Sequence, residues 1–224
     1  MRDFVLTEHA KAVVIERGIS IEWLGGKMKL KRVFIAALLL SSTAVGADDE
    51  AANSPRVFAS RYGNCYAKSV PVDTYGEKGV TRVFLVSAGT DKLMHTYSWY
   101  APQLFLECNV APVGKPVAVS VARIGPWPRG RHANAYDLAV AFYRGGQLLK
   151  QYSTLDIAGA AENVSASVSH YEVLDQIDGY RWRAANDYTF QVRTVDGRSL
   201  SFDAATGEQL RSQSPSVPAP PGHR

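Results

Sequence analysis

The chain has 224 residues, of which 46% are hydrophobic and 21% are charged, and its formal net charge is +4. Residues 1–47 hold 7 Lys and Arg against 4 Asp and Glu, which leaves 18 against 17 in the remaining 177 residues. A nucleic-acid-binding domain carries a basic stripe on its folded body, so this nearly neutral body excludes a nucleic-acid partner. Its length suits one domain or two very small ones.

A secretory signal peptide is predicted over residues 28–47. The basic stretch Lys29–Arg32 precedes an unbroken apolar run, Val33–Leu40, and small residues follow. Val45 and Ala47 fit the −3 and −1 positions of a cleavage site. The alternatives are an uncleaved anchor, which needs roughly 20 apolar residues, or a buried core helix. We expect a bacterial protein of Gram-negative type, periplasmic or secreted, that meets a membrane only during export.

The preceding residues, 1–27, include the stretch "LTEHAKAVVIERGIS". His9, Ala10 and the run Glu16 to Ser20 resemble the opening of a small family similar to RelE-type toxins, whose members begin with these residues. The resemblance covers about 25 residues and stops where the signal begins, so the rest of such a domain is missing and no toxin activity is implied. Either the start codon is assigned too early and Met28 is the true start, or the chain has an extra N-terminal helix.

A single all-β domain is predicted over residues 55–211, after a flexible segment at 48–54. Strands are indicated by alternating or short apolar runs bounded by turn residues. The clearest runs are 81–88, 93–100, 104–110, 116–124 and 164–169. In 93–100 the alternation places Leu93, His95, Tyr97 and Trp99 on one buried face. In 164–169 it predicts a buried face with Val164 and Val168.

Two hairpins and one short helix complete the predicted elements. Gly145-Gly146 and Asp196-Gly197 each separate two alternating runs, and such dipeptides favour tight hairpin turns. Residues 153–162 predict a short helix or a turn capped by Ser153 or Thr154. About eight to ten strands favour an antiparallel β-sandwich or a barrel-like fold, besides the N-terminal signal helix.

Aromatic residues alternate with arginines at 180–183. Tyr180 and Trp182 are predicted to pack in the core, while Arg181 and Arg183 face water.

The C-terminal residues fall into a turn and a tail. "FDAATGEQL" resembles the last hairpin of PepSY-type exported modules, in which Asp and Thr-Gly precede an apolar strand end, and Asp203, Thr206 and Gly207 match that pattern. The helices that such a resemblance implies are not evident elsewhere in the chain. Residues 212–224 are rich in Pro and Ser and predict a disordered tail.

The two cysteines, Cys65 and Cys108, are predicted to form a disulfide, because an isolated pair of cysteines in an exported protein favours a disulfide bond. Cys108 shares the apolar face of its strand with Leu104 and Leu106, where a structural disulfide belongs. The alternatives are two buried free thiols or half of a metal site, but a metal site needs further ligands and none flank the cysteines.

The loop at 125–137, "GPWPRGRHANAYD", holds the candidate ligand contacts Trp127, Arg129, Arg131 and His132. Rigid scaffolds often present recognition residues on such loops, and Trp and Arg are frequent anchors of contacts. The loop would then contact an anionic or sugar-like ligand of the cell envelope, or an unknown envelope protein. Alternatively, Trp127 plugs the end of the sandwich and the arginines are solvated.

The sequence contains no Gly-x-Ser-x-Gly elbow, no His-Glu-x-x-His pair and no phosphate-binding loop. No catalytic residue, metal or cofactor is therefore assigned. We expect an exported β-rich protein that binds or scaffolds. One alternative is an envelope hydrolase or the inhibitor of one, with Arg131 and His132 beside a cleft. Another is a subunit of a surface assembly that pairs through an edge strand.

Overall fold

The structure is a computed structural model that describes residues 50–108, 118–184 and 187–210. All of these residues belong to one compact unit, Ala47–Arg224. The predicted N-terminal extension (1–27), the signal peptide (28–47) and the tail (212–224) lie outside the described residues.

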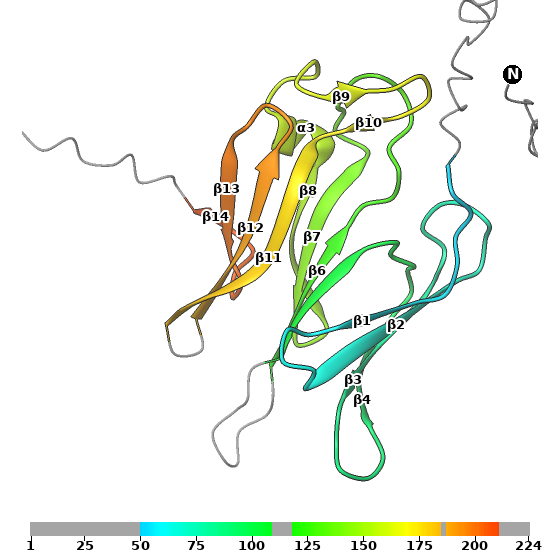
Figure 1. Ribbon diagram of the computed structural model, residues 1–224, viewed down its shortest axis with the longest axis vertical. Coiled ribbons are helices and arrows are strands. Elements are labelled where there is room, and N and C mark those ends of the chain that lie inside the picture. The colour runs from blue at the N-terminus through cyan, green and yellow to red at the C-terminus, as the bar shows by residue number, and fades with distance from the viewer. Residues whose placement is uncertain (1–49, 109–117, 185–186, 211–224) are drawn as a thin grey trace, which may run out of the picture. The chain divides into compact units, whose positions relative to one another are not determined.

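Three four-stranded antiparallel sheets contain most of the strands (Figure 1). The first sheet comprises β1 (Arg56–Ala59), β2 (Cys65–Pro71), β3 (Gly79–Leu85) and β4 (Lys92–Tyr97), in that order. The middle sheet comprises β5 (Leu104–Cys108), β6 (Val119–Ile124), β7 (Leu138–Arg144) and β8 (Gln147–Ser153). The last sheet comprises β11 (Leu174–Ala184), β12 (Asp187–Thr194), β13 (Ser199–Asp203) and β14 (Gln209–Leu210).

Two smaller elements join the middle and last sheets. The helix α3 (Thr154–Ala158) follows β8, and β9 (Ser165–Ala166) pairs with β10 (Tyr171–Glu172). The predicted antiparallel all-β fold with one short helix is confirmed. In the described part of the chain, none of the four sheets closes into a barrel.

The two central strands of the middle sheet, β6 and β7, are buried on both faces. In β6, Val119 and Val121 belong to an apolar core shared with the first sheet, whereas Ala122 belongs to a second core shared with the last sheet. Successive side chains of a strand point to opposite faces. The middle sheet therefore packs against the first sheet with one face and against the last sheet with the other.

The core between the middle and last sheets is built on phenylalanines. The Phe190 ring lies 5.4 Å from Phe105 and 5.4 Å from Phe142, measured between ring centroids, and meets both edge-on. Ala122 pairs with Phe105 on one side and with Phe142 on the other. Because the methyl group of Ala122 is small, the Phe190 ring has room to reach both neighbours.

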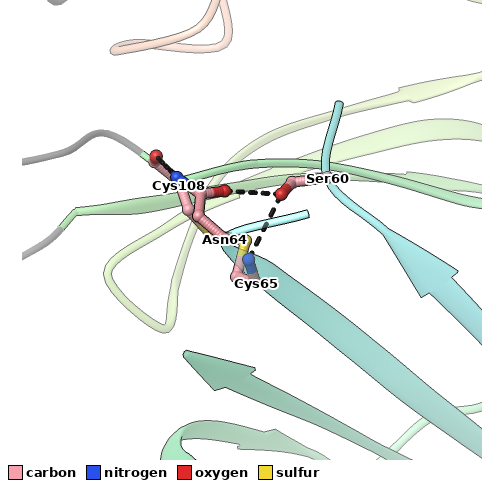
Figure 2. Close-up of a disulfide and its surroundings, with 4 residues drawn as sticks. All are labelled: Ser60, Asn64, Cys65 and Cys108. Atoms are coloured by element: carbon pink, nitrogen blue, oxygen red, sulfur yellow. Dashed lines mark hydrogen bonds between the residues drawn. A yellow bond between two sulfur atoms is a disulfide. The ribbon is translucent and has the colours of Figure 1, made fainter. Parts of the chain in front are cut away.

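The core between the first and middle sheets contains the predicted disulfide. Cys65 in β2 and Cys108 in β5 are bonded, with Cα atoms 6.2 Å apart. Figure 2 shows the polar groups around this bond. The Asn64 side-chain amide donates to the Cys108 carbonyl oxygen (2.8 Å), and the Ser60 hydroxyl donates to the side-chain oxygen of Asn64 (2.6 Å). The disulfide and these bonds hold the start of β2 against the end of β5.

Both predicted hairpins and the helix cap are confirmed. Gly145 and Gly146 join β7 to β8 with φ of 57° and 87°, and Gly197 lies in the β12–β13 turn with φ of 85°. Ser153 caps α3 through a reciprocal capping box with Asp156.

Three apolar side chains that the sequence places in the core are exposed instead. Leu93 is 49% exposed because a bulge shifts the pairing: Val83 faces His95 but Phe84 faces Leu93, so Met94 is the extra residue. A bulge of this kind moves the following side chains to the other face of the sheet.

The other two corrections concern the ends of elements. Val168 is 82% exposed because residues 164–169 form only the two-residue strand β9 and no buried face. Trp182 is 63% exposed although it shares a face with buried Tyr180. Trp182 pairs with Tyr188, close to the β11–β12 turn, and lies beyond the phenylalanine core.

Replacing both cysteines by serine is expected to lower the free energy of unfolding. The bond closes a loop with a sequence separation of 43 residues, and the chain-entropy treatment gives about 4 kcal/mol for such a loop. Equilibrium urea unfolding of the oxidised protein and of the Cys65→Ser/Cys108→Ser variant measures the difference. Reductant should lower the midpoint of the wild type and leave the variant unchanged; equal stability of the two oxidised proteins contradicts the expectation.

Candidate functional site

The loop at 125–137, which connects β6 to β7, is fixed to neighbouring segments along its first half. The N–H of Gly130 donates to the carbonyl oxygen of Ser169, and the N–H of Tyr171 donates to that of Pro128. At Gly125 a Cβ atom would lie 1.7 Å from the carbonyl oxygen of Leu138, so only glycine fits this close approach. The loop is therefore held in one path.

The second half of the loop is anchored by a buried polar network. The Tyr171 hydroxyl donates to the carboxylate of Asp137 (2.7 Å) and lies 2.8 Å from the Thr154 hydroxyl. The Asn134 side-chain amide donates to the same carboxylate (2.7 Å). Burial, above all, raises the pKa of Tyr171 to about 12. The hydroxyl consequently remains protonated at neutral pH and holds the loop in place.

A cavity of about 480 Å³ has Trp127 in its wall, and we call it the Trp127 cleft. Its polar lining includes Glu50, Asn53, Arg56, Gln103 and Glu172. Tyr100 adds a second large aromatic side chain. The cleft therefore combines aromatic surface with several hydrogen-bonding groups, as ligand sites commonly do.

Two contacts position the aromatic and charged groups of the cleft. The indole ring of Trp127 packs against the imidazole of His170, with ring centroids 3.8 Å apart. The guanidinium of Arg129 donates to the carboxylate of Glu50 (2.7 Å). Arg129 is thus placed beside the cleft through a residue that lines it.

The four predicted contact residues separate into two groups. Trp127 lines the cleft, and Arg129 reaches it through Glu50. Arg131 and His132 are exposed and lie outside the lining of the cleft. Across the described ranges no hydrogen bond joins His132 to a carboxylate, which is the contact that the hydrolase hypothesis requires.

Sequence reasoning did not identify Glu50, Arg56 and Glu172. Glu50 and Arg56 come from the start of the domain and Glu172 from β10, and neither their spacing nor the composition around them differs from that of other charged surface residues. Only the fold brings them to one cavity.

A second cavity, of about 310 Å³, lies where β1, β5 and β11 approach one another, and we call it the Glu107 cavity. Arg61, Glu107, Tyr180 and Arg181 contribute to its lining. Glu107 lies on the face of β5 opposite Cys108. That face is covered by the last sheet, and Glu107 is only 3% exposed. Burial raises the pKa of the Glu107 carboxyl, while the N–H of Cys108 and the charge of Arg61 oppose the rise.

The described residues carry no group of three or more side chains able to hold a metal ion. In the same part of the chain, no helix has the length and apolar character needed to cross a membrane. No family model, curated protein or solved structure matches the chain.

Replacing Glu107 by Gln is expected to stabilise the protein more at pH 7 than at about pH 4. A carboxyl whose pKa is raised by folding holds its proton more tightly in the folded than in the unfolded state. Stability therefore falls as pH rises from the unfolded pKa through the folded pKa, and a Gln side chain does not contribute to this fall.

Urea unfolding of the wild type and of the Glu107→Gln variant at both pH values measures the effect. Glu162→Gln, at an exposed carboxyl, is the matched control and should show no such difference. A Glu107→Gln variant with the same stability change at both pH values contradicts the expectation.

Proposed function

We propose that this protein is exported to the periplasm or secreted, and that it binds a sugar-like ligand in the Trp127 cleft. The Lys29–Ala47 leader supports export, and the Cys65–Cys108 disulfide is typical of an oxidising compartment. The observation that carries the binding role is the cleft itself, in which a Trp side chain lies among carboxylate and amide groups.

The chemistry of the lining fits a carbohydrate. A sugar ring has a C–H face that packs against the electron-rich face of an aromatic ring, which Trp127 supplies. The hydroxyl groups of a sugar need hydrogen-bond acceptors and donors, and Glu172, Gln103 and Asn53 provide both.

The charge of the lining favours a neutral or amino sugar over an anion. Two carboxylates, Glu50 and Glu172, and one guanidinium, Arg56, line the cleft. Arg129 lies beside it but is already paired with Glu50. An anionic ligand would meet at least one carboxylate that has no pairing arginine among these contacts, and like charges repel.

The alternative of an envelope hydrolase is supported by Glu50 and Glu172, and not by Arg131 and His132, the residues that the sequence indicates. Glu50 and Glu172 line the same cavity, and most glycoside hydrolases act through two carboxylates that flank the bond to be cleaved. If the protein is such an enzyme, incubation with an oligosaccharide releases shorter products, and Glu172→Gln abolishes this release while leaving binding measurable. Intact oligosaccharide after prolonged incubation contradicts the hydrolase alternative and leaves the binding role.

Replacing Trp127 by Ala is expected to weaken oligosaccharide binding on the order of tenfold or more, which corresponds to about 1.4 kcal/mol of binding free energy. The loss follows from removing the aromatic wall of the cleft. Calorimetric titration of the oxidised full-length protein with tetra-N-acetylchitotetraose measures binding, and tetragalacturonate serves as the anionic comparison.

Trp182→Ala is the matched control, because Trp182 is exposed and lies outside the cleft. It should bind as the wild type does. Equal affinity of Trp127→Ala and wild type, or tighter binding of tetragalacturonate than of the neutral tetrasaccharide, contradicts the proposal.

A further inference from the structure

The first strand of the middle sheet, β5, pairs with β6 on one side, and among the described residues no strand pairs with its other side. Leu104, Leu106 and Cys108 direct their side chains toward the first sheet, while Phe105 and Glu107 point toward the last sheet. The unpaired edge of β5 thus opens sideways, between β1 and β11. These two strands supply the remaining walls of the Glu107 cavity.

The backbone groups of Cys108 point toward this edge. In an antiparallel pair, residues alternate between those that exchange both hydrogen bonds with the partner and those whose N–H and C=O point away. Val119, the partner of Cys108, has its carbonyl bonded to Gly145 on the β7 side, so this pair exchanges no bond. Consistently, the Cys108 carbonyl accepts from the side chain of Asn64 (Figure 2), and its N–H donates to the Glu107 carboxylate.

The same alternation fixes the backbone groups of the rest of the strand. At its other end, Ile124 donates its N–H to the carbonyl of Gln103, so Gln103 faces β6. The alternation counted from Gln103 and the alternation counted from Cys108 give the same result. The backbone groups of Phe105 and Glu107 bond to β6, whereas the N–H and C=O groups of Leu104 and Leu106 point to the unpaired edge. Both leucines are 4% exposed and line the Glu107 cavity.

Backbone groups at a strand edge favour a hydrogen-bonding partner, since an N–H or C=O that is shielded from water and left unpaired destabilises the fold. The four groups of Leu104 and Leu106 are spaced as those of a strand edge, and an extended backbone is the structure that bonds to such an edge. Side chains of that backbone would point alternately toward β1 and toward β11. Phe58 and Tyr180 give the cavity apolar surface, and Arg61 is its cation that is not paired with Asp178.

We propose that an extended segment of another protein, carrying acidic side chains, adds to β5 at Leu104–Leu106 and occupies the Glu107 cavity. Arg61, on the β1 side, attracts the acidic groups. Arg181, on the β11 side, pairs with Asp178 (3.3 Å), so these two residues together add no net charge to the cavity. Glu107 opposes an acidic segment weakly, because its carboxylate is buried, bonded to the Cys108 N–H and has a raised pKa. This site is separate from the Trp127 cleft and does not rest on the sugar-binding role.

Amide hydrogen exchange measured by NMR on the oxidised full-length protein tests the edge. The amides of Leu104 and Leu106 should exchange on the order of tenfold faster than those of Phe105 and Glu107. The probe is the hexapeptide Glu-Val-Glu-Val-Glu-Val, labelled with fluorescein for anisotropy titrations and unlabelled for NMR. Its addition should slow exchange at Leu104 and Leu106 specifically. Slow exchange at both leucines in the free protein, or no change with millimolar peptide, overturns the proposal.

Two comparisons test the chemistry of the partner. Methylating alternate backbone nitrogens of the peptide should abolish binding, because those nitrogens can no longer donate. The variant Arg61→Gln should weaken binding at least severalfold, whereas Arg82→Gln, at an exposed arginine of the first sheet, should not. Binding that survives methylation, or a Lys-Val hexapeptide that binds as well as the Glu-Val one, overturns the proposal.

Discussion

Side chains on both faces of β6 are buried, and this two-sided burial places constraints on every neighbouring element. Val119 and Val121 face the first sheet, and Ala122 faces the last sheet. A sheet that is buried on both faces needs a layer packed against each face. The chain therefore forms one antiparallel sheet before the middle sheet and another after it. The charged Arg123 fits the face toward the first sheet only because the Trp99 ring lies 4.7 Å from its guanidinium and Glu77 pairs with it at 2.9 Å.

Local patterns predicted the elements whose structure depends on a few adjacent residues. The Gly145-Gly146 turn needs positive φ at both positions, and the cap of α3 needs Ser153 and Asp156 three residues apart; each requirement is visible in the sequence. Burial depends on what lies opposite, and no local pattern records that. The bulge at Met94 separates Leu93 from the alternation that includes His95 and Tyr97. Trp182 lies on the same strand face as Tyr180 but beyond the end of the core.

The candidate site shows the same division. Trp127 could be predicted because two prolines and two glycines fix the path of its loop, and the first of those glycines proved to be required by the carbonyl of Leu138. Glu50 and Glu172 could not, since they lie 122 positions apart and meet at one cavity only through the fold. Glu107 lies opposite the apolar face that the sequence indicates for β5, and no local pattern records the sheet that covers it.

The edges of the three sheets differ in how they resist pairing with other strands, and the difference gives β5 its place in the structure. Bulges interrupt the pairing of β4, β8 and β11, and β14 has two residues and β1 has four. Irregular or short edges are poor templates for another strand. β5 is paired without a register shift along its whole length. Its Cys108 end is closed by the disulfide, the Asn64 amide and the Glu107 carboxylate. The unprotected length is therefore set by side chains of β5 and β2, and it coincides with the part of the edge that opens into a cavity.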